Sequence, residues 1–172
     1  ILERLEQSNA LTRRLGRGRR AYRYHDLLRT FLLAELRRTD PRAERELQHT
    51  AARWYQRQGE HLHAMEHLAM AGDLEQVVAV ARSHGLAALL SGRARRLHAI
   101  LAGLSAHDAP GPVVALLLAA ASLELDRKEE ADRWLVHLDL EDIASGPDPT
   151  LAVLAAAVGT ARARFDLDVS AA

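Results

Sequence analysis

The stretch GEHLHAMEHLAMAG at residues 59–72 decides the fold, because a comparable stretch occurs twice more along the chain. Its opening residue, Gly59, is followed after 33 residues by Gly92 and after a further 34 by Asp126. Each of the three follows one helical stretch and opens another. Four later positions also align: Ala64 with Leu97 and Ala131, His67 with Ile100 and Trp134, Leu68 with Leu101 and Leu135, and Ala71 with Leu104 and Leu138. The sequence therefore predicts a helical repeat.

A helix-turn-helix unit of about 34 residues is the period of tetratricopeptide (TPR) repeats. In such arrays each unit packs on the next and buries a continuous core. Two features depart from the pattern. Leu97 stands where a small residue is usual, and His84-Gly85 predicts a break that ends a helix over 74–83. We expect residues 40–172 to form an irregular, TPR-like right-handed superhelix that is incomplete at its C-terminus.

The helix boundaries follow from capping residues. Asp40-Pro41 combines an N-cap with a proline at the first helical position, and Gly72-Asp73 combines a helix stop with a new N-cap. We expect helices over 41–58, 62–71, 74–83, 94–104, 113–125, 128–138 and 150–165, a loop over 145–149 and a frayed tail over 166–172. In the first helix, the residues expected to face inward are Ala43, Leu47, Thr50, Ala51, Trp54 and Tyr55.

The N-terminal residues have a different pattern. Ile1–Asn9 is a short amphipathic piece. Two runs that suit extended strands, 10–15 and 20–24, then flank the turn Gly16-Arg17-Gly18. A helical period follows over 25–38, with an apolar stripe of Leu28, Phe31, Leu32 and Leu36. This order predicts a β-hairpin wing within residues 1–39, which we interpret as the closing part of a winged-helix domain. The predicted fold class is all-α with one small hairpin.

Composition narrows the function classes. The chain has 172 residues, 48% hydrophobic and 27% charged, and no cysteine. The absence of cysteine excludes disulfide frameworks, thiolate zinc sites and thiol nucleophiles, and favours a reducing, cytoplasmic location. The longest apolar run, 113–123, is too short to span a bilayer, and no signal-peptide pattern opens the chain. Because the first residue is Ile1 within an apparent helix, we expect a segment of a longer protein.

Charge is unevenly distributed. Residues 1–60 carry 14 Arg and 8 acidic residues, a net charge of +6, whereas residues 61–172 carry 9 basic and 15 acidic residues, a net charge of −6. This asymmetry suggests two parts with different partners. Lys128 is the single lysine among 23 basic residues, and this preference for Arg fits a GC-rich bacterial genome.

Two stretches resemble a known family. YRYHDLLRTFL at residues 22–32 resembles the end of the winged-helix domain in signal-transduction ATPases of the STAND class, where His25-Asp26 matches a His-Asp motif and Tyr24 replaces its Met. Residues 40–73, with Asp40-Pro41, Trp54-Tyr55 and Ala71-Gly72-Asp73, resemble the start of the helical arm in MalT-like regulators. These regulators are the large ATP-binding members of the LuxR-type transcription factors. The resemblance covers roughly residues 1–140.

The resemblance implies an NTPase domain, a winged helix, a TPR-like sensor and a C-terminal LuxR-type helix-turn-helix in one longer chain. It implies that ADP is held at rest and that binding of a small-molecule or protein inducer favours the ATP-bound state. The partners would be the NTPase domain of the same chain and that inducer, with DNA bound through the helix-turn-helix. This segment contains no G-x-x-x-x-G-K-S/T loop, so we expect no cofactor here and ADP or ATP in the full-length protein.

His25 is the main candidate site residue. An imidazole at the start of a helix can donate to a phosphate and so sense nucleotide. The residue alone favours a capping or packing role at the junction of hairpin and helix; the resemblance implies an ADP-phosphate sensor in the full-length protein. Asp26 beside it is expected to stabilise the first helical turn.

A basic cluster on the predicted wing is a candidate nucleic-acid site. Five guanidinium groups in eight residues can follow a phosphate backbone. The alternatives are a solvated turn or a contact with the NTPase domain, and the resemblance favours these. The cluster consists of Arg13, Arg14, Arg17, Arg19 and Arg20.

The remaining candidates are on the repeats. Trp54, Tyr55 and Trp134 can line a ligand groove or pack between repeats. His63 and His67, close to His61, have the i, i+4 spacing of metal ligands, but no Cys or carboxylate completes a site, so we predict no metal. The acids of the third repeat opening are expected to form a solvated turn: Glu124, Asp126, Glu129, Glu130 and Asp132.

No nucleophile and base pattern indicates catalysis, so we expect no enzyme activity in this chain. The sequence supports a regulatory segment that relays inducer or partner binding to a nucleotide switch. A stand-alone TPR-like scaffold for a protein or peptide, and direct DNA binding through the wing, are the alternatives. No membrane contact is expected.

Overall fold

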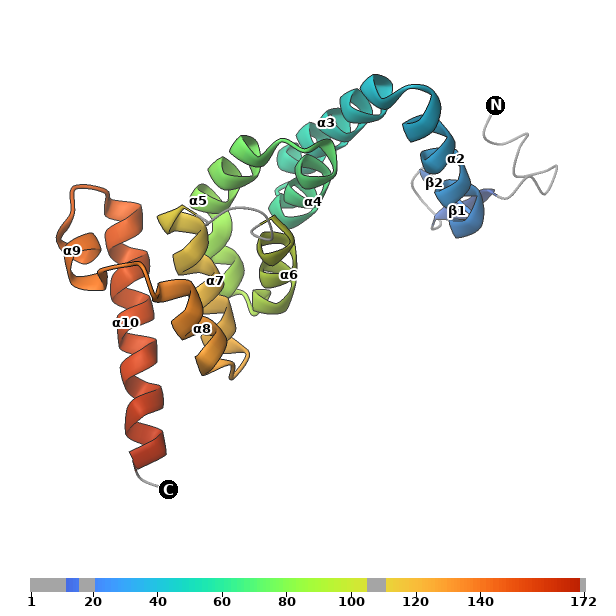
Figure 1. Cartoon of the computed structure of the whole chain (residues 1–172). Coiled ribbons are helices and arrows are strands. Elements are labelled where there is room, and N and C mark those ends of the chain that lie inside the picture. Colours follow the sequence, from blue (N-terminus) through green and yellow to red (C-terminus); the bar gives the residue numbers. More distant parts are fainter. Residues whose placement is uncertain (1–11, 16–20, 105–110, 171–172) are drawn as a thin grey trace. The chain divides into compact units, whose positions relative to one another are not determined.

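The computed structural model describes residues 12–15, 21–104 and 111–170 (Figure 1). The chain divides into two compact units, residues 1–47 and residues 48–172. Helix α3 (Pro41–Arg57) contains the boundary, which therefore falls within the helix that we expected to open the second domain at residue 40. Nearly all described elements are helices, which confirms the prediction of a predominantly helical chain.

The first unit contains a short antiparallel strand pair and a helix. Strands β1 (Thr12–Leu15) and β2 (Ala21–Tyr24) pair in a register that sets Thr12 opposite Tyr24. The pair coincides with the residues for which the sequence predicts extended runs. The predicted amphipathic piece Ile1–Asn9 and the turn Gly16-Arg17-Gly18 lie outside the described residues.

Helix α2 (Asp26–Thr39) follows the strands directly. Asp26 lies in its first turn and Arg37 and Arg38 in its last, an arrangement that complements the helix dipole. None of its residues is buried, and Phe31 of the predicted apolar stripe is 64% exposed. The apolar stripe of α2 is therefore not buried in this unit.

Helix α3 begins as predicted but turns a different face inward. Asp40 caps it by accepting a hydrogen bond from the Ala43 backbone nitrogen at 2.9 Å, with proline at the first helical position. Its buried residues are Glu44, Gln48 and Ala52. Three of the six residues expected to face inward are instead exposed: Leu47 at 58%, Trp54 at 50%, and Thr50. The predicted inward stripe was therefore wrong at these three residues, whereas Ala43, Ala51 and Tyr55 are half-buried.

Hydrogen bonding explains why polar side chains are buried on α3. Gln48 Oε1 lies 2.7 Å from His67 Nδ1, and Glu44 Oε1 accepts from Arg37 Nε at 3.1 Å. A buried polar group that keeps its hydrogen bonds escapes most of the desolvation cost. An apolar pattern alone cannot identify a face of this kind.

The second unit is an array of helices (Figure 1). Several boundaries match the prediction closely, but α8 ends three residues early and is followed by a helix that the sequence analysis missed, whose N-cap is Asp139. The final helix also continues through the predicted frayed tail to Ser170. The helices are α4 (His61–Ala71), α5 (Leu74–Leu90), α6 (Ala94–Leu104), α7 (Pro112–Glu124), α8 (Lys128–Leu135), α9 (Leu140–Ser145) and α10 (Pro149–Ser170).

The three residues that open the repeats share one backbone conformation. Gly59, Gly92 and Asp126 have positive φ angles of 75°, 73° and 58°. The residue after each donates its backbone N–H to the carbonyl five positions back, as in Glu60 to Tyr55, Arg93 to Ala88 and Arg127 to Ser122. This pattern ends a helix in the left-handed conformation that glycine tolerates best. The turns are therefore equivalent in geometry as well as in spacing.

Burial also repeats from unit to unit. The aligned residues Ala64, Leu97 and Ala131 are all buried, as are the aligned leucines four positions later. Those leucines are Leu68, Leu101 and Leu135. The larger Leu97 thus occupies the same inward position as its small counterparts.

Helix α5 runs without a break from Leu74 to Leu90, so the predicted interruption at His84-Gly85 was wrong. Gly85 is buried, and a Cβ atom placed on it would lie 2.6 Å from Leu117 Cδ1 of α7. The glycine therefore permits the close approach of two helices. Its backbone is helical, a conformation that other residues also adopt.

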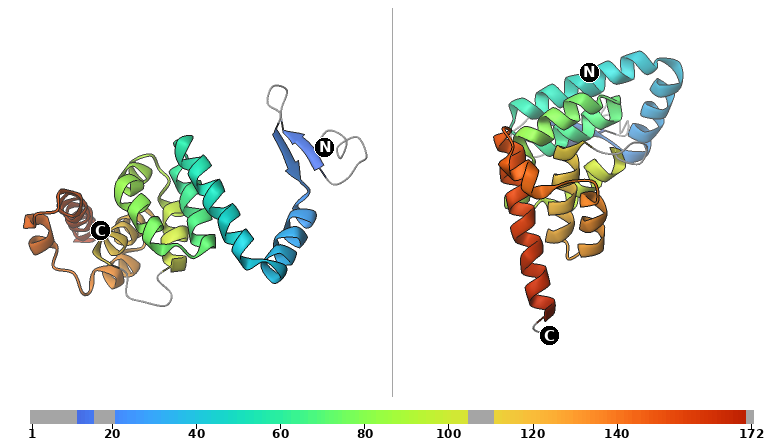
Figure 2. Two further views of the ribbon diagram at one scale, coloured as in Figure 1. Left: turned by 90° about the horizontal axis from the view of Figure 1, so that it is seen from above. Right: turned by 60° about the vertical axis from the view of Figure 1, so that its left-hand side comes forward.

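Helix α7 is the centre of the second unit. It contacts α5, α6, α8 and α10, and Figure 2 shows α10 as the long helix that ends the array. Nearly every residue of the apolar run 113–123 is buried. A helix that is apolar on all sides is expected in such a central position.

Candidate functional site

His25 lies at the N-terminus of α2 and is exposed. Its Nδ1 accepts a hydrogen bond from the Leu27 backbone nitrogen at 3.4 Å, so it serves as the N-cap of the helix. An acceptor at Nδ1 leaves the proton of a neutral imidazole on Nε2. The structure thus shows the capping role, and the geometry is compatible with an Nε2–H donor at a helix N-terminus.

The basic cluster is described only in part. Arg13 and Arg14 belong to β1, opposite Arg23 and Tyr22 of β2. Arg17, Arg19 and Arg20 lie outside the described residues, so the cluster as a nucleic-acid site stays a prediction.

An aromatic stack joins α3 to α4. The ring of Tyr55 stacks on His63 and His67, with centroids 4.8 Å and 5.2 Å apart, and Trp54 meets Tyr55 edge-on at 4.9 Å. His63 Nδ1 also lies 3.4 Å from Glu60 Oε2. The two histidines with metal-ligand spacing therefore pack on one tyrosine. In the described residues, no group of three or more metal-ligating side chains is found.

The three aromatic residues predicted for a ligand groove fall in two places. Trp54 and Tyr55 contact each other, while Trp134 on α8 packs against the hydrophobic core with its Nε1 buried and without a partner. Two hollows in the second unit are lined by other side chains.

One hollow, of about 310 Å³, opens beside a histidine pair. The rings of His61 on α4 and His84 on α5 are parallel to within 5° with centroids 3.4 Å apart. Burial, and then the charge of the neighbouring His61, hold the pKa of His84 below its ordinary value. His84 was missed as part of this cluster because its partner is distant in sequence. The lining residues are Gln56, His61, Gln76, Ala79, Val80, Ser83 and His84.

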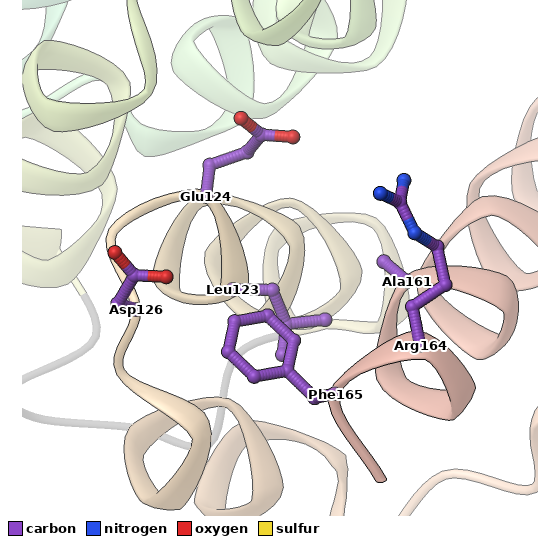
Figure 3. A pocket seen from close by; sticks show the side chains of 6 residues that line it. All are labelled: Leu123, Glu124, Asp126, Ala161, Arg164 and Phe165. Carbon is purple, nitrogen blue, oxygen red and sulfur yellow. The ribbon is translucent and has the colours of Figure 1, made fainter. Parts of the chain in front are cut away.

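A second hollow, of about 300 Å³, lies between the end of α7, the turn to α8, and α10 (Figure 3). Glu124 and Asp126 contribute carboxylates, Arg164 contributes a guanidinium, and Phe165 lies across Leu123. The sequence pattern predicts a solvated turn for both acids and gives no signal for Arg164 or Phe165. The one available signal was Asp126, an acid at a position where both earlier repeats have glycine.

The N-terminal end matches a known domain class. Residues 1–44 match a family model for a winged-helix domain. The model is that of the MalT winged helix domain, so the match supports a MalT-like transcription regulator as the source of this segment. No curated protein and no solved structure was found to match the chain.

Among the described helices, none combines the length and the apolar character that a membrane span requires.

Proposed function

We propose that this chain is the regulatory segment of a cytoplasmic, ATP-dependent transcription activator of the LuxR family, similar to the MalT-like members of the STAND class. In this proposal β1, β2 and α2 close a winged-helix domain, and the helices from α3 onward begin a TPR-like sensor arm. The observation that carries it is the MalT winged helix match at residues 1–44, directly before the repeating helices. The segment itself performs no catalytic step.

The proposed mechanism is a binding equilibrium. An inducer or partner protein binds the helical arm in one of two states of the whole protein and shifts their populations by its differential affinity. The winged helix connects that shift to an NTPase domain in the same chain, where ADP is held at rest and ATP in the active state. DNA is contacted by a separate helix-turn-helix.

His25 is the proposed contact between this segment and the nucleotide. Its Nδ1 is occupied by the Leu27 N–H, so the Nε2–H is the group that donates to a phosphate of ADP. Loss of that donor is expected to weaken the ADP-bound state and raise basal transcription.

The test begins with the coding region on both sides of this segment. A phosphate-binding loop upstream and a helix-turn-helix downstream are the expected result. A complete gene that lacks both contradicts the proposal and leaves a binding scaffold.

In the full-length protein, His25→Asn then separates the two roles of this residue. Asparagine preserves the N-cap through its amide oxygen, and its shorter side chain has no N–H at the position of the imidazole Nε2. We expect His25→Asn to lower ADP retention and raise basal transcription, while His137→Asn, at an exposed histidine on the second unit, leaves both unchanged. Unchanged ADP retention in His25→Asn would contradict the sensor role.

A further inference from the structure

We propose that the hollow between α7 and α10 binds a small zwitterion with the chemistry of an α-amino acid. The ammonium group of the ligand faces Glu124 and Asp126, its carboxylate faces Arg164, and its side chain lies on Phe165 and Leu123 (Figure 3). This inference deepens the proposed sensor role, because it names the class of ligand that the helical arm takes.

The acidic side of the hollow favours a cation for two reasons. Glu124 is the last residue of α7, where the helix dipole is already negative, and Asp126 follows two residues later. The last turn of α7 contains no basic residue, and Arg127, which follows Asp126, pairs with Glu130 at 3.3 Å. An ammonium group placed here is attracted by both carboxylates and by the helix terminus.

Asp126 occupies this place at a conformational cost. Its φ of 58° is the left-handed region that Gly59 and Gly92 adopt at the equivalent turns. Glycine is the residue best suited to that backbone, although aspartate is one of the few others that tolerate it. The equivalent turns at Gly59 and Gly92 form without a carboxylate, so the turn does not explain Asp126, whereas cation binding in the hollow does.

The opposite side of the hollow supplies a cation and an apolar surface. Arg164 and Phe165 are adjacent on α10, with Ala161 one turn before them. Figure 3 shows the Arg164 guanidinium on the far side of the hollow from Asp126, and the Phe165 ring over Leu123. Guanidinium groups bind carboxylates with two parallel hydrogen bonds, and the aromatic face favours both apolar groups and ammonium ions.

The separation of the two charges selects a zwitterion. Within the part of the chain that the structure describes, no ion pair joins Arg164 to Glu124 or Asp126. A ligand with one charge satisfies only one side, whereas an α-amino acid carries an ammonium group and a carboxylate on the same α-carbon. At about 300 Å³, the hollow is at the small end of ligand pockets, which suits a single amino acid.

Isothermal titration of the purified chain with three matched probes tests the charge requirement. L-Leucine has both charges, leucinamide has only the ammonium, and N-acetyl-L-leucine has only the carboxylate. We expect L-leucine to bind at least about tenfold more tightly than either analogue, since each lost charge-assisted hydrogen bond costs roughly that factor. Equal binding of leucinamide and L-leucine, or no binding of any probe, would overturn the inference.

Three variants locate the binding in this hollow. Asp126→Asn retains a residue that tolerates the left-handed backbone, and Glu124→Gln and Arg164→Gln remove the other charges. Each is expected to weaken L-leucine binding by about tenfold. The controls, Glu129→Gln and Arg133→Gln on α8, remove exposed charges outside the hollow and are expected to leave binding unchanged. Equal losses in variants and controls would show binding elsewhere.

Failure of this inference is distinguishable from failure of the proposed function. Direct titration measures ligand binding in the segment alone, while ADP retention measures the switch in the full-length protein. If ADP retention in the full-length protein depends on His25 but the segment binds no amino acid, the ligand class is wrong and the proposed nucleotide switch stands.

Discussion

Gly85 of α5 and Leu117 of α7 approach so closely that a Cβ atom on Gly85 would lie 2.6 Å from Leu117 Cδ1. Leu117 is fully buried and belongs to the central helix, so its side chain has little room to move. This pair joins the second helix of the first repeat to the second helix of the second repeat and sets the distance between the two helices.

Gly85→Ala is therefore expected to destabilise the chain by about 1–3 kcal/mol through overpacking, in spite of alanine's higher helix propensity. The matched control is Gly159→Ala in α10, where no atom lies within 4 Å of the added Cβ. That control is expected to stabilise the chain by up to about 1 kcal/mol. Urea denaturation of both variants measures the difference, and equal effects would contradict the close-contact explanation.

The stacked pair His61 and His84 predicts a loss of stability at mildly acidic pH. The pKa of His84 is lowered by burial and then by the charge of His61, so the unfolded chain binds a proton there more readily than the folded chain. Stability from this group is present above the ordinary pKa of 6.5 and is lost as pH falls through the lowered value.

Thermal unfolding between pH 8 and pH 5 measures this dependence. His84→Gln is expected to flatten the fall of Tm on acidification, and His137→Gln, at an exposed histidine, is expected to leave it as in the parent chain. The same slope in His84→Gln as in the parent would refute the assignment.

Glu66 on α4 and Arg96 on α6 form a two-bond ion pair between neighbouring repeats. The two N···O distances are both 2.7 Å, and the Arg96 side chain holds the pKa of Glu66 below its ordinary value. Since the side chains are 33% and 36% exposed, we expect a coupling energy of only about 1 kcal/mol. This coupling is present above the ordinary pKa of 4.5 and disappears as pH falls through the lowered pKa of Glu66.

A double-mutant cycle with Glu66→Gln and Arg96→Gln measures that coupling. The comparison pair is Arg42 and Glu46 on α3, whose side chains are 85% and 67% exposed. Its coupling is expected to be about 0.3–0.5 kcal/mol, as is usual for i, i+4 pairs. A larger coupling at the exposed pair would contradict the prediction.

Asp126 is expected to be suboptimal for stability. Asp126→Gly, which restores the residue of the two earlier turns, should raise the free energy of unfolding by roughly 0.5–1 kcal/mol, because glycine has no Cβ to strain at a φ of 58°. Asp126→Val should lower it, since a branched side chain is poorly tolerated there. Chemical denaturation of both variants tests the order, and a stabilised valine variant would contradict it.

The repeats were predictable from the sequence because their causes are local. Each opening residue ends a helix by its own backbone preference, and the aligned apolar residues recur at a fixed distance from it. The same holds for the helix start at Asp40-Pro41, where the cap hydrogen bond spans three residues. Local capping and periodicity therefore determined the helical class, the repeat and most helix boundaries.

Tertiary contacts determined the rest. In the sequence Gly85 predicts a helix break, whereas in the structure it makes room for Leu117 of another helix. The polar face of α3 is buried because Gln48 contacts His67, nineteen residues away. Both hollows likewise combine side chains from different helices. Sequence spacing shows which residues share one face of a helix. A site depends on which residues of different helices come into contact, and only the packing of the helices determines those contacts.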